Sequence, residues 1–187
     1  MRKNMQTNQT KNTQAYKLDI EQIRKNARKH VEQGAQTSLY MGDPTEIIAL
    51  LNESLATELV CTLRYRRHFY TASGIHSKSI AAEFKVHADE ELAHADLIAE
   101  RIVQLGGEPD FNPDRLLNRS HADYNESTDL KEMIKENLVA ERIAIDAYHA
   151  LIRYIGDKDP TTRVMLEGIL AQEEEHADEL ADWITIA

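Results

Sequence analysis

Apolar residues recur at helical spacing along most of this 187-residue chain. In the segment that follows Asp43, for example, Ile47, Leu51, Leu55 and Leu59 return every four residues, which places them on one face of an α-helix. No segment is predicted as a β-strand. We therefore predict an all-α chain with four long helices, at residues 44–72, 77–105, 127–155 and 160–185.

The ends of these helices are marked by residues with known capping preferences. Residues 43–46 (Asp-Pro-Thr-Glu) combine an N-cap, a proline at the first helical position and a capping-box glutamate, and residues 159–160 repeat the Asp-Pro pair. Ser127 is the predicted N-cap of the third helix. Gly74, Gly106 and Gly156 are expected to stop the helices that precede them.

The connections between the helices predict the topology. The first and second helices are joined by a few residues, as are the third and fourth, so the members of each pair are antiparallel. The connection from Gly106 to Glu126 is much longer and must carry the chain along the length of the bundle. The expected fold is a four-helix bundle with one long crossover between its second and third helices.

The N-terminal region differs in composition from the rest of the chain. Residues 1–17 are polar and of low complexity, and residues 19–33 are predicted as a short amphipathic helix that stops near Gly34. Residues 1–31 carry a net charge of +6 against −10 for the whole chain, which leaves −16 for the remainder (−10 − 6). We divide the chain into a basic N-terminal extension (1–43) and a bundle (44–187). The extension could bind nucleic acid weakly, or it could dock on the acidic body.

Cysteine content and hydropathy bear on the compartment. The chain has one cysteine, Cys61, so it can form neither an intrachain disulfide nor a Cys-x-x-Cys metal site. The first residues lack the apolar core of a signal peptide, and no later run is apolar enough to span a membrane. We therefore expect a cytoplasmic protein without a membrane partner.

Two of the predicted helices carry the same Glu-x-x-His motif. The second helix contains Glu91 and His94, and the fourth contains Glu173 and His176. Residues three apart lie on neighbouring turns of one helix face, so each pair can present a carboxylate and an imidazole to the same metal ion. Any one of these glutamates, taken alone, would be interpreted as a solvated surface residue.

A lone glutamate precedes each motif, Glu58 in the first helix and Glu141 in the third. The separations between the halves nearly coincide, since 141 − 58 = 83, 173 − 91 = 82 and 176 − 94 = 82, and Tyr65 and Tyr148 each follow their glutamate by seven residues. Two Glu-x-x-His pairs and two further glutamates can form a carboxylate-bridged dimetal site in a four-helix bundle. Four carboxylates also balance two divalent cations (−4 against +4), whereas without metal they would repel one another.

These six residues resemble the ferroxidase centre of bacterioferritins and of the related Dps-like ferritins, and the resemblance covers about residues 44–185. It implies a ferritin-like bundle that holds two iron ions per subunit, for which manganese or zinc could substitute. It also implies that Glu91 and Glu173 bridge the metals, that Glu58 and His94 complete one site, and that Glu141 and His176 complete the other.

Two features depart from the bacterioferritin pattern. Leu92 stands where bacterioferritins have their haem-binding methionine, so no haem is expected. The chain ends at Ala187, just beyond the last predicted helix, without the short fifth helix of 24-subunit ferritins. We therefore expect a Dps-like shell of twelve subunits around a bacterioferritin-type site.

Other residues near the motif allow two interpretations each. Tyr65 matches a redox-active tyrosine near the bacterioferritin site, or it is a core tyrosine with a satisfied hydroxyl. Cys61 is expected to be a small buried hydrophobe, although its spacing places it on the same helix stripe as Glu58. His87 could orient a ligand or bind incoming iron, but a plain surface histidine is the preferred interpretation. The acidic residues of the crossover could line an entry pore or simply be solvated; they are Glu108, Asp110, Asp114, Asp123 and Glu126.

The resemblance predicts a ferroxidase that oxidises Fe²⁺ with O₂ or H₂O₂ and stores ferric mineral in a homo-oligomeric cage. A dimetal peroxidase or manganese catalase on the same scaffold is one alternative. A cage protein that protects DNA through its basic N-terminal extension is another, and for this chain we expect weak, salt-sensitive DNA binding at most.

Overall fold

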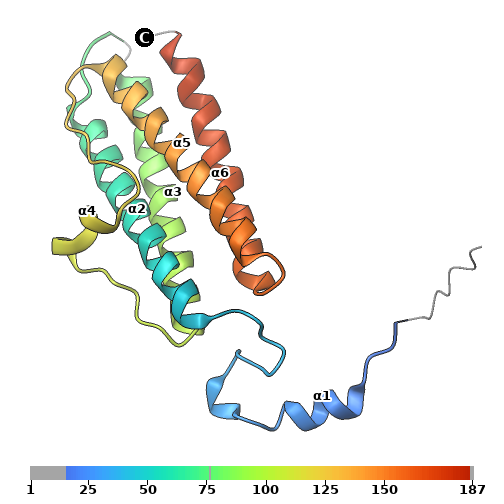
Figure 1. Cartoon of the computed structure of the whole chain (residues 1–187). Helices are drawn as coiled ribbons and strands as arrows, with labels where there is room; N and C mark the ends of the chain where they lie inside the picture. Colours follow the sequence, from blue (N-terminus) through green and yellow to red (C-terminus); the bar gives the residue numbers. More distant parts are fainter. Residues whose placement is uncertain (1–15, 76, 186–187) are drawn as a thin grey trace, which may run out of the picture.

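The computed structural model describes residues 16–75 and 77–185, and within them it contains helices and no strand (Figure 1). The four long helices are α2 (Pro44–Thr71), α3 (Ser77–Gln104), α5 (Leu130–Ile155) and α6 (Pro160–Ile184). The shorter elements are α1 (Ile20–Asn26), η1 (Val31–Gln33), η2 (Pro113–Arg115) and α4 (Leu116–Arg119). No described helix combines the length and the apolar character needed to cross a membrane.

The long helices form the predicted all-α bundle. Helix α2 packs along α3 and α5 packs along α6, while contacts between α2 and α5 and between α3 and α6 join the two pairs. Residues 105–129 form the long crossover, which runs beside the bundle and includes η2 and α4 (Figure 1). The fold class and the single crossover predicted from the sequence are therefore confirmed.

Aspartates cap three of the four long helices, α2, α5 and α6, and the sequence interpretation missed the one at α5. The Asp43 side chain accepts from the backbone N–H groups of Thr45 and Glu46, as predicted. The prediction of Ser127 as the cap of the third helix was wrong, because α5 begins at Leu130 and the side chain of Asp129 is its cap. The N–H of Ser127 is instead bonded to Asn125 in the preceding loop.

The predicted N-terminal helix over residues 19–33 is shorter in the structure. Helix α1 ends at Asn26, buries none of its residues and lies away from the bundle (Figure 1). A short helix without a packed apolar face is marginal, and His30, which adopts a left-handed conformation (φ 50°), separates α1 from η1. The predicted tail at residues 1–17 lies outside the described residues except for its last two positions. The division at residue 43 stays a prediction.

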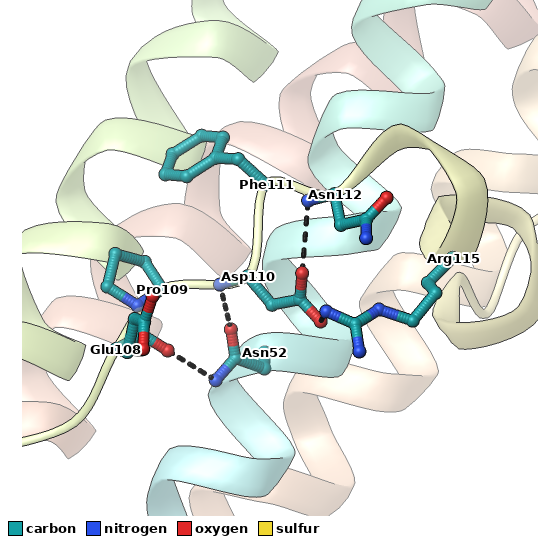
Figure 2. Close-up of a pocket in the computed structure, with 7 residues that line it drawn as sticks. All are labelled: Asn52, Glu108, Pro109, Asp110, Phe111, Asn112 and Arg115. Atoms are coloured by element: carbon teal, nitrogen blue, oxygen red, sulfur yellow. Dashed lines mark hydrogen bonds and ion pairs between the residues drawn. The ribbon is translucent and has the colours of Figure 1, made fainter.

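The crossover is fixed to α2 by a polar network around Asn52 (Figure 2). The Asn52 side chain donates to the carbonyl of Glu108 and accepts from the N–H of Asp110 at 2.7 Å. The Asp110 carboxylate pairs with Arg115 at 2.9 Å and with Arg119 at 3.5 Å. Asp110 therefore stabilises the crossover. This is a structural role, and the sequence had suggested only a pore lining or a solvated position for it.

The described buried apolar residues form two large clusters along the bundle axis and a small third one of Cys61, Ala122 and Ala140. On α2, Leu55 belongs to one cluster and Tyr65 to the other, and the buried Glu58 lies between them in sequence. The same order, with apolar residues on both sides of buried acidic residues, recurs on α3, α5 and α6. The bundle thus encloses a polar layer between the two large apolar clusters, and the six residues predicted from the sequence as metal ligands lie in that layer.

Candidate metal centre

The polar layer contains all six residues that the sequence predicts as metal ligands. Helix α2 contributes one glutamate, α5 contributes another, and α3 and α6 contribute a glutamate and a histidine each. They form two overlapping groups whose ligand atoms lie within 4.8 Å of one another: Glu58, Glu91, His94 and Glu173 in one, and Glu91, Glu141, Glu173 and His176 in the other. Each of the six is at most 3 % exposed. Glu91 and Glu173 belong to both groups and so occupy the positions expected of bridging ligands.

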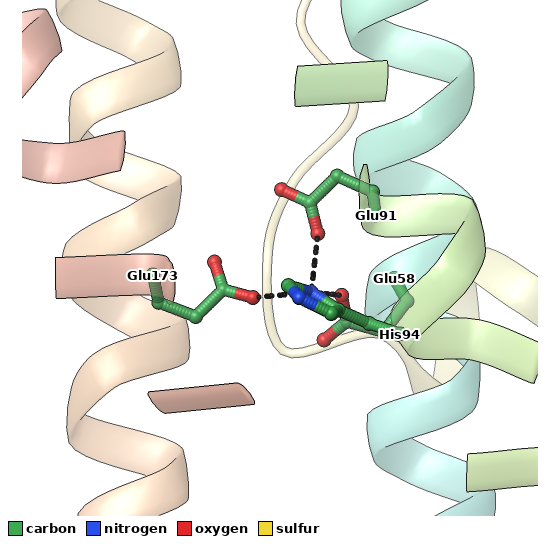
Figure 3. Close-up of side chains that lie close together, drawn as sticks. All are labelled: Glu58, Glu91, His94 and Glu173. Atoms are coloured by element: carbon green, nitrogen blue, oxygen red, sulfur yellow. Dashed lines mark ion pairs between the residues drawn. The ribbon is translucent and has the colours of Figure 1, made fainter. Parts of the chain in front are cut away.

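His94 lies at the centre of the first group (Figure 3). Its Nδ1 is 3.0 Å from Glu173 Oε1, 3.4 Å from Glu58 Oε2 and 3.7 Å from Glu91 Oε2. Burial acts to lower the pKa of His94, but the three carboxylates outweigh burial and raise it above the ordinary value for histidine. This nitrogen can therefore bind either a proton or a metal ion that also contacts the three carboxylates.

The second group is more open. His176 Nδ1 lies 3.8 Å from Glu91 Oε1 and 4.0 Å from both Glu141 Oε2 and Glu173 Oε2. Both histidines thus direct Nδ1 toward the shared glutamates, and their Nε2 atoms face away from them.

The carboxylates titrate differently according to their surroundings. Burial and the charges of neighbouring glutamates raise the pKa values of Glu91 and Glu173 well above the ordinary value. Burial also acts to raise the pKa of Glu58, but His94, Glu91 and the hydroxyl of Tyr148 outweigh it and lower that pKa. A cluster of carboxylates of this kind attracts and binds cations.

Unsatisfied ligand atoms show that the site fits a metal ion. Seven buried atoms of the centre make no hydrogen bond, although the two histidine nitrogens among them lie within ion-pair distance of the glutamates: Glu58 Oε2, Glu91 Oε1, His94 Nδ1, Glu141 Oε2, Glu173 Oε1, Glu173 Oε2 and His176 Nδ1. Buried polar atoms are normally paired, and leaving one unpaired costs about 1–3 kcal/mol. Carboxylate and imidazole ligands suit Fe²⁺, Mn²⁺ and Zn²⁺, so the residues present fit a pair of divalent ions.

Two tyrosines make hydrogen bonds across the centre to Glu58 and Glu141, which we call the outer glutamates because each belongs to only one ligand group. The Tyr65 hydroxyl donates to Glu141, and the Tyr148 hydroxyl donates to Glu58. Burial and the nearby carboxylates raise the pKa values of both tyrosines well above the ordinary value, so both remain protonated donors. Tyr65, for which the sequence left two roles open, therefore has a satisfied hydroxyl and also contacts a ligand.

Two further residues contact Nε2, the outer ring nitrogen, of the two histidines. The sequence interpretation missed both. His94 Nε2 lies 2.8 Å from Gln172 Oε1, and His176 Nε2 lies 2.9 Å from Glu90 Oε2. Each supporting residue immediately precedes the glutamate of the opposite Glu-x-x-His motif. Their position next to the motif is the only signal that could have indicated them.

His87 is not the surface histidine that the sequence interpretation preferred. It is 1 % exposed, its Nε2 lies 2.9 Å from Glu179 Oε2, and its ring stacks on that of His176 at 4.1 Å. Trp183 stacks on His87 as well, with ring centroids 5.7 Å apart. The alternative prediction, that His87 orients a ligand, agrees with this arrangement.

Cys61 is buried, as expected of a small core residue, and burial raises the pKa of its thiol well above the ordinary value. Its sulfur lies 3.5 Å from the guanidinium of the buried Arg64. Arg64 also donates to the side chain of Asn137 on α5 and to the carbonyl of Asp123 in the crossover. This network fixes the crossover beside the centre and involves no acidic side chain.

The chain is similar to several known proteins. Residues 48–186 match the profile of the ferritin-like domain. Bacterioferritin from Mycobacterium avium is 31% identical over 140 residues, which cover 74% of this chain and 83% of that protein. A nutrient stress-induced DNA-binding protein from Synechococcus is 28% identical, over 81% of this chain and 85% of that protein. A dodecameric thioferritin, the bacterioferritin-related protein from Bacteroides fragilis, superposes with a TM-score of 0.75 at 32% identity, covering 78% of this chain and 88% of that one.

Proposed function

The chain belongs to the family of proteins with a ferritin-like domain, and we propose that it is a ferroxidase that oxidises Fe²⁺ at a dimetal centre and stores the ferric product. The observation that carries this proposal is the pair of overlapping ligand groups that share Glu91 and Glu173. In the proposed arrangement these two glutamates would serve both ions, Glu58 and His94 would complete one half-site, and Glu141 and His176 would complete the other. Four carboxylates then balance two divalent ions.

The residues of the chain would bind and orient the iron ions during their oxidation. Two bound Fe²⁺ ions would supply two electrons together to O₂ or H₂O₂. Hard carboxylate oxygens favour the ferric product, and the imidazoles retain affinity for Fe²⁺. Tyr65 and Tyr148 keep the outer glutamates oriented, and the two apolar clusters restrict the access of water to the layer.

We propose a homo-oligomeric shell as the storage assembly, with twelve subunits. The similar protein from Bacteroides fragilis is described as dodecameric, and it is 32% identical to this chain. A light-scattering mass near that of 24 subunits of 21.3 kDa, rather than that of 12, would contradict the proposed number of subunits.

DNA binding is a second candidate function. Four basic residues on or just after α1 are exposed and form what we call the basic cluster, which consists of Arg24, Lys25, Arg28 and Lys29. The relative from Synechococcus is named as a DNA-binding protein. The charge of the bundle opposes phosphate binding, so the proposed affinity is weak and confined to low salt.

Aerobic loading of the full-length protein with Fe²⁺ tests the main proposal. The wild type should oxidise Fe²⁺ rapidly and store many iron ions per shell, whereas a peroxidase or manganese catalase would turn over peroxide without storing metal beyond the two ions of each centre. Glu91→Ala should abolish rapid oxidation while the assembly stays intact, because both ions lose a ligand. Glu83→Ala, on the exposed side of the same helix, is the matched control and should oxidise Fe²⁺ at the wild-type rate. Wild-type oxidation by Glu91→Ala would overturn the proposal.

A further inference from the structure

The internal repeat of the centre is broken at one pair of positions. Glu90 and Gln172 are related by the same separation as the two motifs, because 172 − 90 = 82 and 173 − 91 = 82. All other paired groups of the centre are chemically identical in the two halves: two outer glutamates, two shared glutamates, two histidines and two tyrosines. At this pair alone one half has a carboxylate and the other has an amide.

Each member of this pair supports the histidine of the opposite half. Gln172 Oε1 lies 2.8 Å from His94 Nε2, and Glu90 Oε2 lies 2.9 Å from His176 Nε2. Both contacts occupy the outer ring nitrogen, so in both histidines Nδ1 remains available to the centre. The geometry of the two supports is the same, and their charge differs.

The residues around the two histidines also differ between the halves, and again the polar groups lie beside His176. His176 stacks at 4.1 Å on His87, which is itself held by Glu179. The positions equivalent to His87 and Glu179 are occupied by Ile169 and Leu97, since 169 − 87 = 82 and 179 − 97 = 82. Polar groups therefore accompany His176, and apolar residues stand at the equivalent positions of the other half.

We propose, on the basis of the proposed dimetal centre, that its half-sites are unequal and that Glu90 and Gln172 set their difference. A carboxylate behind a ligating imidazole makes the imidazole a stronger donor than an amide does, and such supports change metal affinity by about 10–100-fold. The half-site of Glu141 and His176 therefore binds a divalent ion more tightly. It is filled first and emptied last, and the half-site of Glu58 and His94 is the one that exchanges iron.

The expected difference lies toward the lower end of that range. The Glu90 side chain is 37 % exposed, so water screens part of its charge. We expect the two binding steps of the wild type to differ by about 10-fold. Glu90 and Gln172 are positioning residues in this scheme, because they act on the metal through a histidine.

Titration of the metal-free, full-length protein with Co²⁺ tests the proposal, because this ion binds without turnover and its visible spectrum reports each step. The wild type should bind two equivalents in two resolved steps. Glu90→Gln gives His176 the same support that His94 has, so the tighter step should weaken by about 10-fold and the steps should merge. Gln172→Glu should instead tighten the weaker step, and the double exchange should restore two steps with their order reversed.

Glu83→Gln is the matched control, since it removes the same charge from an exposed position of the same helix two turns away. This variant should titrate as the wild type does. Anomalous diffraction from a crystal with one equivalent of Co²⁺ should place the metal beside His176 and Glu141.

The possible outcomes separate this inference from the proposed function. Two equivalents that bind in indistinguishable steps, or in steps that Glu90→Gln leaves unchanged, would overturn the inference and leave the dimetal centre standing. A single Co²⁺ beside His94 at half loading would also overturn it. Failure of the wild type to bind any Co²⁺ would overturn the proposed centre and the inference together.

Discussion

Replacing one shared glutamate by its amide should affect stability in opposite directions with and without metal. Glu91 is 1 % exposed, and burial together with Glu173, Glu141 and Glu58 raises its pKa well above the ordinary value. A carboxyl group of this kind contributes stability that is present below its unfolded-state pKa of about 4.5 and is lost as the pH rises through the folded-state value. The metal-free wild type should therefore lose stability as the pH is raised above 4.5.

Glu91→Gln removes this cost, because an amide carries no charge and can donate to neighbouring carboxylates. Glu91 Oε1 is buried without a hydrogen bond, and the usual cost of such an atom sets the scale of the gain at about 1–3 kcal/mol. For a chain of this size that gain corresponds to a rise in Tm of roughly 2–12 °C in the metal-free protein at pH 8. The pH dependence of Tm should also become flatter than in the wild type.

With metal the order should reverse. An ion present at about 100 times its Kd stabilises a folded protein by about 2.7 kcal/mol, and the variant lacks a shared carboxylate and should gain less. Scanning calorimetry with EDTA and with Co²⁺, with Glu83→Gln as the control, measures both differences. If Glu91→Gln lowers the Tm of the metal-free protein, or if Co²⁺ leaves the wild-type Tm unchanged, then Glu91 is not held in a repulsive metal-binding cluster.

Tyr148→Phe removes the hydroxyl that holds Glu58 and should weaken at least one Co²⁺ step by about 10-fold or more; an unchanged titration would mean that the hydrogen bond does not orient the ligand. Asp159→Asn breaks a buried ion pair with Arg101 and should lower the free energy of unfolding in denaturant titration by about 3–5 kcal/mol. Thr162 and Arg101 outweigh burial and lower the pKa of Asp159, so in the wild type this contribution should be lost as the pH falls from 3.8 through the folded-state value; the two proteins should then converge in stability, and a difference that stays constant as the pH falls would argue against it. Replacing the basic cluster with alanine should remove any low-salt gel shift with DNA and leave the Fe²⁺ oxidation rate unchanged, and a shift that persists would place DNA binding elsewhere.

The bundle was predictable because its signals are local. The Asp-Pro starts of α2 and α6 and the four-residue apolar spacing that begins at Ile47 specify helices without reference to distant contacts. At α5 the sequence predicted Ser127 as the cap, but Asp129, two residues later, caps the helix, because both residue types are favourable caps and local chemistry alone does not fix which one is used. The N-terminal helix was predicted too long because its periodicity has no bundle face to pack against.

The ligand set was visible because each Glu-x-x-His pair is local and the repeat links the two halves. The contacts that support the ligands run between helices, with 92 residues separating His87 from Glu179 and 86 separating Glu90 from His176. No spacing within one helix indicates such contacts. His87 consequently appeared to be a surface residue until the fold brought α3 and α6 together.

Anomalous diffraction from a crystal loaded with iron would locate the metal ions relative to their ligands. We predict two iron peaks about 3.5–4 Å apart within one subunit, with Glu91 and Glu173 each contacting both peaks. Iron held between two subunits, or either of these glutamates directed into solvent, would contradict it.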